Sequence, residues 1–239
     1  MRYGSGLWRG LAVLFFFCLV FAAGAQASEL TRLADISRII SHNGQGVHAN
    51  VQRVPLAATH AGLDFNRRSD TTLARRWGMS RPRLEAEADW LASCSRGACR
   101  DRRIEPWMKA VAVIRATPRK SRPARVQALL SRRIHYVSDL AIDDHWANPL
   151  ATLLGRAGDC EDHALLKRAM LMAAGFSDAE VPLLVLETAK GQGHMTLLVA
   201  QSDHALVLDN RFRSPVRLGS LGKDRIVAVA SGAGYFVAR

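Results

Sequence analysis

The sequence reads Gly158-Asp159-Cys160-Glu161-Asp162 immediately before an apolar-periodic segment, residues 163–174. Asp159 is a typical helix N-cap, and Gly175 is typical of the C′ residue that ends a helix. Cys160 would then lie in the first turn, where unpaired backbone N–H groups and the helix dipole favour a thiolate. Because the thiolate is the nucleophilic form of cysteine, the stretch predicts a reactive residue. The alternative is a buried cysteine that packs as a small hydrophobe.

The acids Asp159, Glu161 and Asp162 affect this interpretation in two ways. Three carboxylates beside Cys160 argue against an apolar core position. They also oppose a low thiol pKa, unless a positive group lies nearby.

The N-terminus has the pattern of a secretory signal. Arg2 and Arg9 form a basic region, residues 11–21 are apolar, and 25–27 read Ala-Gln-Ala, a small-residue cleavage site. We expect cleavage after Ala27, which leaves residues 28–239 as one exported domain in the periplasm with no integral membrane segment. An uncleaved anchor is the alternative.

The chain is basic, with 33 Lys and Arg against 21 Asp and Glu and a formal net charge of +12. The arginines are scattered, with short clusters at 67–68, 100–103 and 115–125. No basic tract is interleaved with aromatic residues, so binding of single-stranded nucleic acid is not predicted. We interpret the charge mainly as a solvated surface, which could help the protein meet an acidic partner.

Three cysteines remain after the expected cleavage. Cys94 and Cys99 are close enough in sequence to close a small disulfide loop in an oxidising compartment. A zinc site there would need two further ligands, and none is evident. Cys160 is then the odd thiol, which itself indicates reactivity in an exported protein.

The periodicity predicts helices first and strands afterwards. Helical faces are expected over 30–40, 81–91, 104–114 and 123–137, with 42–64 as a loop or irregular strand. Extended segments follow at 181–186, 194–200, 205–209, 225–230 and 234–237. Helices followed by an antiparallel sheet are typical of the α+β class.

A cysteine nucleophile needs a base, and the base needs a third group to orient it. If residues 201–204 form a hairpin tip, Ala200 pairs with Ala205 and Thr196 lies opposite Asp209. His194 is then one diagonal step from Asp209, a separation of roughly 7–8 Å that side chains can bridge. This register predicts that Asp209 orients His194. A histidinium there would also favour the Cys160 thiolate.

Non-catalytic interpretations stay open for each residue. His194 could be an ordinary hydrogen-bonded strand histidine, and Asp209 could cap a strand and start a turn. Cys160-x-x-His163 could begin a metal site. Structural or exposed roles are expected for the other histidines, His135, His145, His163 and His204.

Several motifs together resemble one family. Residues 146–149 read Trp-Ala-Asn-Pro, and they are followed by the Gly-Asp-Cys-Glu-Asp stretch, by His194-Met195 and by residues 208–210, Leu-Asp-Asn. This set resembles the bacterial transglutaminase-like cysteine peptidases, whose best-known members are the LapG-type periplasmic proteases. The resemblance covers roughly residues 126–210.

The resemblance implies a papain/transglutaminase-like fold, with the catalytic cysteine opening a helix against an antiparallel sheet. It implies Cys160 as nucleophile, His194 as base and Asp209 as orienting acid. It also implies calcium held by Asp159 and Glu161, and we choose Asp143 from the 139–144 loop as a further ligand. A divalent cation would neutralise the acids beside the thiol.

The expected function is therefore that of an exported cysteine endopeptidase, with oxyanion donors that include the Cys160 backbone N–H. The resemblance implies a large surface adhesin as substrate, cut to control biofilm attachment, and an inner-membrane receptor that senses a cyclic dinucleotide. Two alternatives remain: acyl transfer by a transglutaminase or amidase acting on peptides or cell-wall amines, and a non-catalytic binding module on the same fold.

Overall fold

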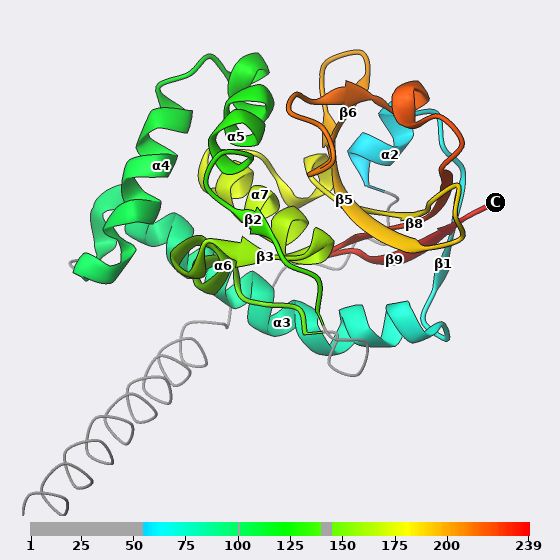
Figure 1. Ribbon diagram of the computed structural model, residues 1–239, viewed down its shortest axis with the longest axis horizontal. Helices are drawn as coiled ribbons and strands as arrows, with labels where there is room; N and C mark the ends of the chain where they lie inside the picture. The colour runs from blue at the N-terminus through cyan, green and yellow to red at the C-terminus, as the bar shows by residue number, and fades with distance from the viewer. Residues whose placement is uncertain (1–54, 100, 140–144) are drawn as a thin grey trace, which may run out of the picture. The chain divides into compact units, whose positions relative to one another are not determined.

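A seven-stranded antiparallel sheet combines one early strand with six strands from the C-terminal part of the chain (Figure 1). The structure is a computed structural model that describes residues 55–99, 101–139 and 145–239. The strand order is β1-β9-β8-β4-β5-β6-β7. The strands are β1 (Phe65–Arg68), β4 (Leu183–Glu187), β5 (Gly193–Ala200), β6 (Ala205–Leu208), β7 (Val216–Arg217), β8 (Arg225–Ser231) and β9 (Gly234–Ala238).

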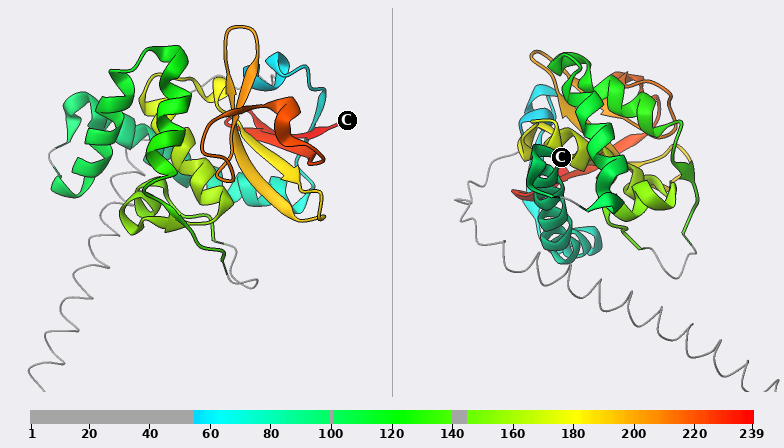
Figure 2. Two further views of the ribbon diagram at one scale, coloured as in Figure 1. Left: turned by 45° about the horizontal axis from the view of Figure 1, so that its top comes forward. Right: turned by 90° about the vertical axis from the view of Figure 1, so that its left-hand side faces the viewer.

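The helices that precede most of the sheet pack against it and against one another (Figures 1 and 2). They are α2 (Leu56–His60), α3 (Thr72–Ser93), α4 (Glu105–Arg115), α5 (Arg122–Leu130), α6 (Pro149–Gly155) and α7 (Cys160–Ala173). A separate parallel pair consists of β2 (His135–Tyr136) and β3 (Ala157–Gly158). This arrangement confirms the predicted α+β class.

The sheet buries apolar side chains on both faces. Along β5, Leu197 and Val199 belong to the core shared with α3–α7, whereas Leu198 and Ala200 belong to the second core, which includes α2. This alternation is the period of two that a strand imposes. The central strands are therefore packed on both faces, and His194 lies at the start of one of them, β5.

Helix α7 begins and ends where the sequence predicts. The Asp159 side chain accepts a hydrogen bond from the Asp162 N–H, and Gly175 has a φ of 95° after the last turn. Three arginines cover the C-terminal carbonyls: Arg115 binds the Ala173 oxygen, Arg122 that of Ala174 and Arg119 that of Gly175.

Those contacts revise the interpretation of the charge. In the 115–125 cluster, Arg115, Arg119 and Arg122 donate to backbone carbonyls at the end of α7 instead of standing free in solvent. Cations at a helix C-terminus interact favourably with its dipole. Part of the positive charge therefore has a structural role.

Two predictions of local structure were wrong. The helix expected over 123–137 ends at Leu130, because the segment turns so that His135 and Tyr136 can pair with Ala157 and Gly158. Within the expected loop 42–64, residues 56–60 form helix α2, whose Ala57 and Ala58 are fully buried. Tertiary pairing and burial outweigh local propensity in both places.

Other differences concern element bounds. Helix α3 starts at Thr72, earlier than the predicted 81, because Thr71 caps it by accepting from the Ala74 N–H at 3.0 Å. Strand β1 was not predicted and pairs with β9 at the sheet edge. The signal segment, its cleavage site and the helix expected over 30–40 lie outside the described residues.

The disulfide between Cys94 and Cys99 is present, as the cysteine spacing predicted. Within the described ranges, no helix is both long enough and apolar enough to cross a membrane.

Candidate active site

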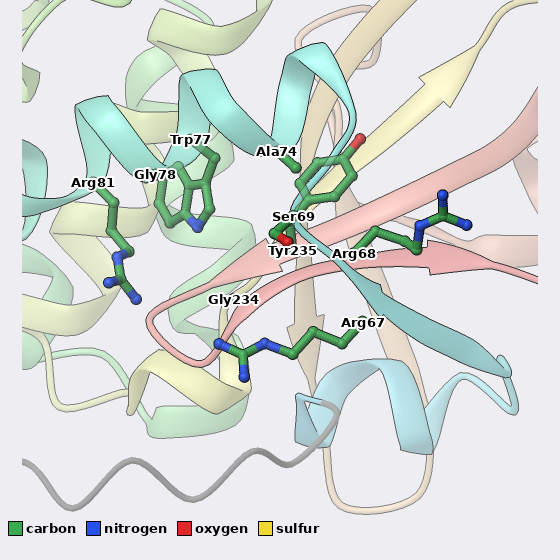
Figure 3. Close-up of a pocket in the computed structure, with 9 residues that line it drawn as sticks. All are labelled: Arg67, Arg68, Ser69, Ala74, Trp77, Gly78, Arg81, Gly234 and Tyr235. Atoms are coloured by element: carbon green, nitrogen blue, oxygen red, sulfur yellow. The ribbon is translucent and has the colours of Figure 1, made fainter.

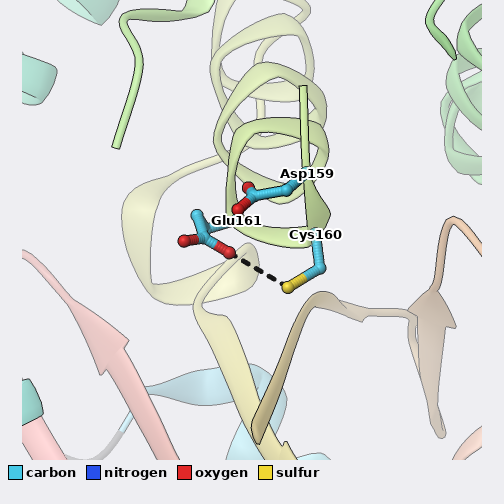
Figure 4. Close-up of side chains that lie close together, drawn as sticks. All are labelled: Asp159, Cys160 and Glu161. Carbon is cyan, nitrogen blue, oxygen red and sulfur yellow. Dashed lines mark hydrogen bonds between the residues drawn. The ribbon is translucent and has the colours of Figure 1, made fainter. Parts of the chain in front are cut away.

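Cys160 is the first residue of α7 and is partly accessible. Its Sγ donates a hydrogen bond to Glu161 Oε2 at 3.0 Å, and Asp159 lies beside the pair (Figure 4). Burial, the charge of Glu161 and this hydrogen bond raise the pKa of the Cys160 thiol above its ordinary range. In this arrangement the acids keep the sulfur protonated, which is the conflict that the sequence anticipated.

The same acids have perturbed pKa values themselves. Burial and the neighbouring Asp159 charge raise the pKa of Glu161 to about 7. Burial also raises the pKa of Asp162 to about 6 and that of Asp159 above its usual value. Buried carboxylates this close together repel one another when ionised, so the cluster favours a bound cation or proton.

His194 and Asp209 are in direct contact, as the assumed hairpin register predicted. β5 and β6 pair from Ala200↔Ala205 to Leu197↔Leu208, and one more step places Asp209 opposite Thr196. His194 Nε2 lies 3.1 Å from each carboxylate oxygen of Asp209. Asp209 is fully buried and His194 nearly so.

The thiol is adjacent to the start of β5. The backbone N–H of Met195, next to His194, is near enough to the Cys160 sulfur to act to lower the pKa of the thiol. With Nε2 occupied by Asp209, Nδ1 is the ring nitrogen of His194 that remains for the thiol proton. The fold therefore places the thiol near the strand that carries the imidazole of the His194–Asp209 pair.

Sequence reasoning missed three residues that surround Asp209. Arg211 donates to both carboxylate oxygens, with Nη2 to Oδ2 at 2.7 Å and Nε to Oδ1 at 3.1 Å. Lys167 Nζ donates to the Leu208 carbonyl at 2.8 Å, and Gln127 Nε2 donates to the Asp209 carbonyl at 2.6 Å. Burial acts to raise the pKa of Asp209, but the hydrogen bonds from His194 and Arg211 outweigh it and hold that pKa well below its usual range.

Some signal for these residues is present in the sequence. Arg211 follows Asp209 by two positions, a spacing that allows a local ion pair. Lys167 interrupts an otherwise apolar helical face seven residues after Cys160, which indicates a charge carried into the interior. Gln127 carries no comparable local signal.

The structure adds Asp139 to the acidic cluster. Its charge acts on Asp159 and Asp162 and raises the pKa of both. Asp139 belongs to the predicted 139–144 loop, but the chosen ligand, Asp143, lies outside the described residues. The Asp162 carboxylate has a different partner: its Oδ1 accepts a hydrogen bond from the Ala147 N–H at 2.8 Å.

A metal would fit this cluster chemically. Ligand atoms of Asp159, Cys160 and Glu161 lie within 4.8 Å of one another, and no other such group occurs within 55–99, 101–139 and 145–239. Two of the three are carboxylates, the hard oxygen donors that calcium prefers. His163 is not part of the group, so the metal site considered at Cys160-x-x-His163 finds no support.

The remaining histidines have separate surroundings. His163 is buried, and burial lowers its pKa to about 4. His135 lies on β2 and His204 binds Asp203 at the hairpin tip. Trp146 is buried with its ring 6.3 Å from that of Trp77, in the core.

Comparisons with known proteins agree with this geometry. A family model described as bacterial transglutaminase-like cysteine proteinase matches residues 86–218. Calcium-bound LapG from Legionella pneumophila is 20% identical, with a TM-score of 0.52 over 63% of this chain and 87% of that chain. EGTA-treated LapG from the same organism is also 20% identical, with a TM-score of 0.53 over 64% and 86%. A search of curated protein sequences found no match. The structural likeness confirms the papain/transglutaminase-like α+β fold.

Proposed function

This chain belongs to the bacterial transglutaminase-like cysteine proteinases, and we propose that it is an exported endopeptidase that works through Cys160, His194 and Asp209. The observation that carries the proposal is the contact of His194 Nε2 with both Asp209 oxygens, at 3.1 Å, on the strand whose Met195 N–H is near the Cys160 sulfur. That the chain is a cysteine peptidase follows from the family; the roles of the three residues are the proposal.

In the proposed reaction His194 Nδ1 takes the thiol proton of Cys160, and the sulfur attacks the carbonyl carbon of the scissile peptide bond. Asp209 accepts the Nε2–H, which fixes the tautomer and favours the imidazolium that forms. The carbonyl oxygen becomes an oxyanion beside the backbone N–H of Cys160. In the first turn of a helix no intrahelical carbonyl accepts that N–H, so it is available to the oxyanion.

The second half restores the enzyme. The imidazolium returns its proton to the leaving amine, the C–N bond breaks, and an acyl-thioester stays on Cys160. His194 then takes a proton from water, whose oxygen attacks the thioester. The sulfur leaves and recovers the proton from His194, and the new carboxylic acid is released.

We propose that Asp159 and Glu161 bind calcium, with Asp139 or Asp143 as a further ligand. The bound cation would supply positive charge that offsets the carboxylates next to the thiol. Glu161 would then be drawn away from the sulfur, and the Cys160 proton would be free for His194. The repulsion among the acids and the hydrogen bond at 3.0 Å between Cys160 and Glu161 support this proposal.

The family further supports a substrate and a setting. We propose a periplasmic location, a large surface adhesin as the protein cut, and a membrane receptor that senses a cyclic dinucleotide as regulator. Comparing surface proteins released by cells with and without the gene tests the substrate. An adhesin that is retained equally in both strains would overturn that part of the proposal.

The catalytic roles are tested by measuring how fast the purified protein and its variants cleave casein. We expect Cys160→Ala to abolish cleavage with an unchanged circular dichroism spectrum, and His194→Ala to be nearly as severe. Asp209→Asn should cost about 10³–10⁴-fold, since it disturbs the tautomer of the base. Cleavage by the Cys160→Ala protein would exclude the proposed nucleophile.

Parallel assays separate hydrolysis from acyl transfer and test the metal. Incorporation of a fluorescent amine into casein, in preference to cleavage, would identify a transglutaminase. EGTA should remove activity, and calcium should restore it better than magnesium. Full activity in EGTA, with no thermal shift on adding calcium, would leave Asp159 and Glu161 as helix caps only.

A further inference from the structure

Two surface cavities of similar size are lined by clustered arginines, and they differ in how those arginines are used. The cavity of about 460 Å³ lies between α3 and strands β1 and β9 (Figure 3). There Arg68 is paired with Asp70, and Arg81 donates to the Gly232 carbonyl. Two of its three guanidinium groups are therefore occupied within the fold.

The second cavity, of about 430 Å³, is lined by arginines whose guanidinium groups have no acceptor among the described residues. It lies among α4, α6 and the turn that joins α5 to β2, and Arg132, Arg133, Arg156 and His135 line it. Within the described part of the chain, no carboxylate or carbonyl accepts a bond from any of the three guanidinium groups. Arg156 also makes no ion pair with Asp159, Glu161 or Asp162, the acids near Cys160.

The backbone holds the two sides of this cavity together. The His135 N–H donates to the Arg156 carbonyl at 2.8 Å, as part of the β2–β3 pairing. Leu153 is buried and Leu154 is 47% exposed, and these two leucines with Pro106 give the cavity an apolar wall. Three cations next to an apolar wall suit an anionic ligand that also has carbon surface.

Arg156 is held in an unusual conformation. Its φ is 56°, and it is the one residue other than glycine with a positive φ in the described ranges. It ends α6 in the left-handed region, where glycine is favoured and a residue with a Cβ is strained. Strained residues of this kind cluster at functional sites. In this backbone conformation Arg156 lines the cavity.

The cavity is close to the candidate nucleophile. Arg156 precedes Cys160 by four residues, so the two Cα atoms are at most about 14 Å apart along an extended chain. About four residues of an extended substrate chain span this distance. The cavity lining contains no Phe, Tyr or Trp on which a nucleic-acid base could stack, and its one aromatic ring is the imidazole of His135.

We propose that this cavity, lined by Arg132, Arg133 and Arg156, binds an acidic segment of the protein substrate close to the cleavage site. The inference rests on the proposed peptidase function and adds a substrate class to it. Side-chain carboxylates would pair with the guanidinium groups, and the carbon stems of Asp and Glu would lie against Leu153 and Leu154. A guanidinium group can donate two parallel hydrogen bonds to the two oxygens of one carboxylate, in a bidentate geometry.

Binding is tested on the Cys160→Ala protein, so that cleavage does not interfere. The probes are a fluorescein-labelled 12-residue peptide in which Asp and Glu alternate with Ala and Leu, and its Asn/Gln counterpart. We expect the acidic peptide to bind at least about 10-fold more tightly by fluorescence anisotropy, and that difference to shrink as salt is raised to about 0.3 M. Equal affinity for the two peptides would overturn the proposal.

Matched variants assign the effect to the cavity. Arg132→Gln, Arg133→Gln and Arg156→Gln together should remove the preference for the acidic peptide. Arg125→Gln, Arg217→Gln and Lys223→Gln together change the net charge equally, away from the cavity, and should retain it. Loss of the preference in both triple variants would show that only the net charge matters, and would overturn the site.

Arg156→Gly excludes misfolding as an explanation. Glycine relieves the strain at φ 56°, so the variant should unfold at higher temperature while it binds the acidic peptide about 3- to 5-fold more weakly. Unchanged affinity would remove Arg156 from the site.

Cleavage assays on the wild-type protein distinguish this inference from the function on which it rests. Selective binding without cleavage of any protein would defeat the proposed function and leave the acidic-peptide site standing. Cleavage at the same rate for casein and for casein with amidated carboxyls would overturn the site and leave the peptidase standing.

Discussion

Arg211 holds the carboxylate of Asp209 in a bidentate ion pair, with its Nη2 2.7 Å from Oδ2 and its Nε 3.1 Å from Oδ1. The backbone N–H of Arg211 also donates to Oδ1, at 2.8 Å. The same guanidinium group also binds Asp224 at 2.7 Å, and Asp224 accepts the Ala189 N–H. A chain of contacts thus runs from the β4–β5 turn through Arg211 to the proposed orienting acid. Arg211 is a positioning residue for Asp209.

We expect Arg211→Met to lower kcat about 10- to 100-fold and to destabilise the protein by about 1–3 kcal/mol at neutral pH, because a fully buried carboxylate loses a charged partner. The pKa of Asp209 is depressed in the folded state, so its contribution to stability is present above its unfolded value of 3.8 and is lost as pH falls toward the folded value.

The loss of stability in Arg211→Met, measured by urea unfolding, should therefore depend on pH, which a general packing defect would not cause. The difference between wild type and Arg211→Met should be largest near neutral pH and should narrow below about pH 4. Arg225→Met, which breaks an exposed pair with Glu187, is the control and should cost less than about 1 kcal/mol at any pH. A difference that does not depend on pH would contradict the role assigned to Arg211.

Lys167 gives a second prediction with the opposite pH sign. It is 2% exposed, and burial lowers its pKa to about 7 from 10.5. Because the folded protein releases this proton at lower pH than the unfolded chain does, Lys167 costs stability below about pH 7, and that cost fades as pH rises toward 10.5.

Replacing Lys167 with Met removes this titration. Between about pH 7 and pH 10 the wild-type free energy of unfolding should rise by about 2–4 kcal/mol relative to that of Lys167→Met. Lys190→Met, at an exposed site, should track the wild type. Parallel pH curves for wild type and Lys167→Met, measured by urea unfolding, would show that Lys167 titrates normally.

The thiol environment predicts the labelling of Cys160. Cys94 and Cys99 are joined, so iodoacetamide should modify Cys160 selectively. In EGTA, the hydrogen bond to Glu161 and the adjacent charges should make labelling slow. Calcium should speed it by about 10-fold or more, because the acids no longer hold the proton on sulfur.

Mass spectrometry of timed samples measures these rates. Glu161→Gln removes the charged acceptor and a proposed ligand, so its labelling should be faster than that of wild type in EGTA and insensitive to calcium. If calcium accelerates labelling equally in wild type and Glu161→Gln, Glu161 is not a ligand.

The arginines at the end of α7 predict a stability effect. Arg115 donates Nε and Nη2 to the Ala173 carbonyl, at 2.9 and 2.6 Å, and Nη1 to Ser95. Arg115→Ala should lower the free energy of unfolding, measured in urea, by about 1–3 kcal/mol, because the last carbonyls of α7 lose a charged donor. Arg125→Ala, an exposed residue on α5, should change stability by less than about 0.5 kcal/mol.

The sequence alone determined the features that depend on local chemistry. Asp159 and Gly175 bracket α7 because a capping side chain and a left-handed glycine act within one turn of the helix. The β5–β6 register followed from a short hairpin, since a period of two leaves little freedom once the turn is placed. The juxtaposition of His194 and Asp209 came from that register.

Tertiary structure decided what depends on distant partners. Residues 131–137 follow an apolar pattern that reads as helix, yet His135 and Tyr136 pair with β3 because that strand is brought alongside them. Arg115 and Ala173 are 58 positions apart, and no local pattern joins them. The same holds for the cavity of Arg132, Arg133 and Arg156, because side chains from separate elements converge only when the chain packs, and burial and charge then act across that contact.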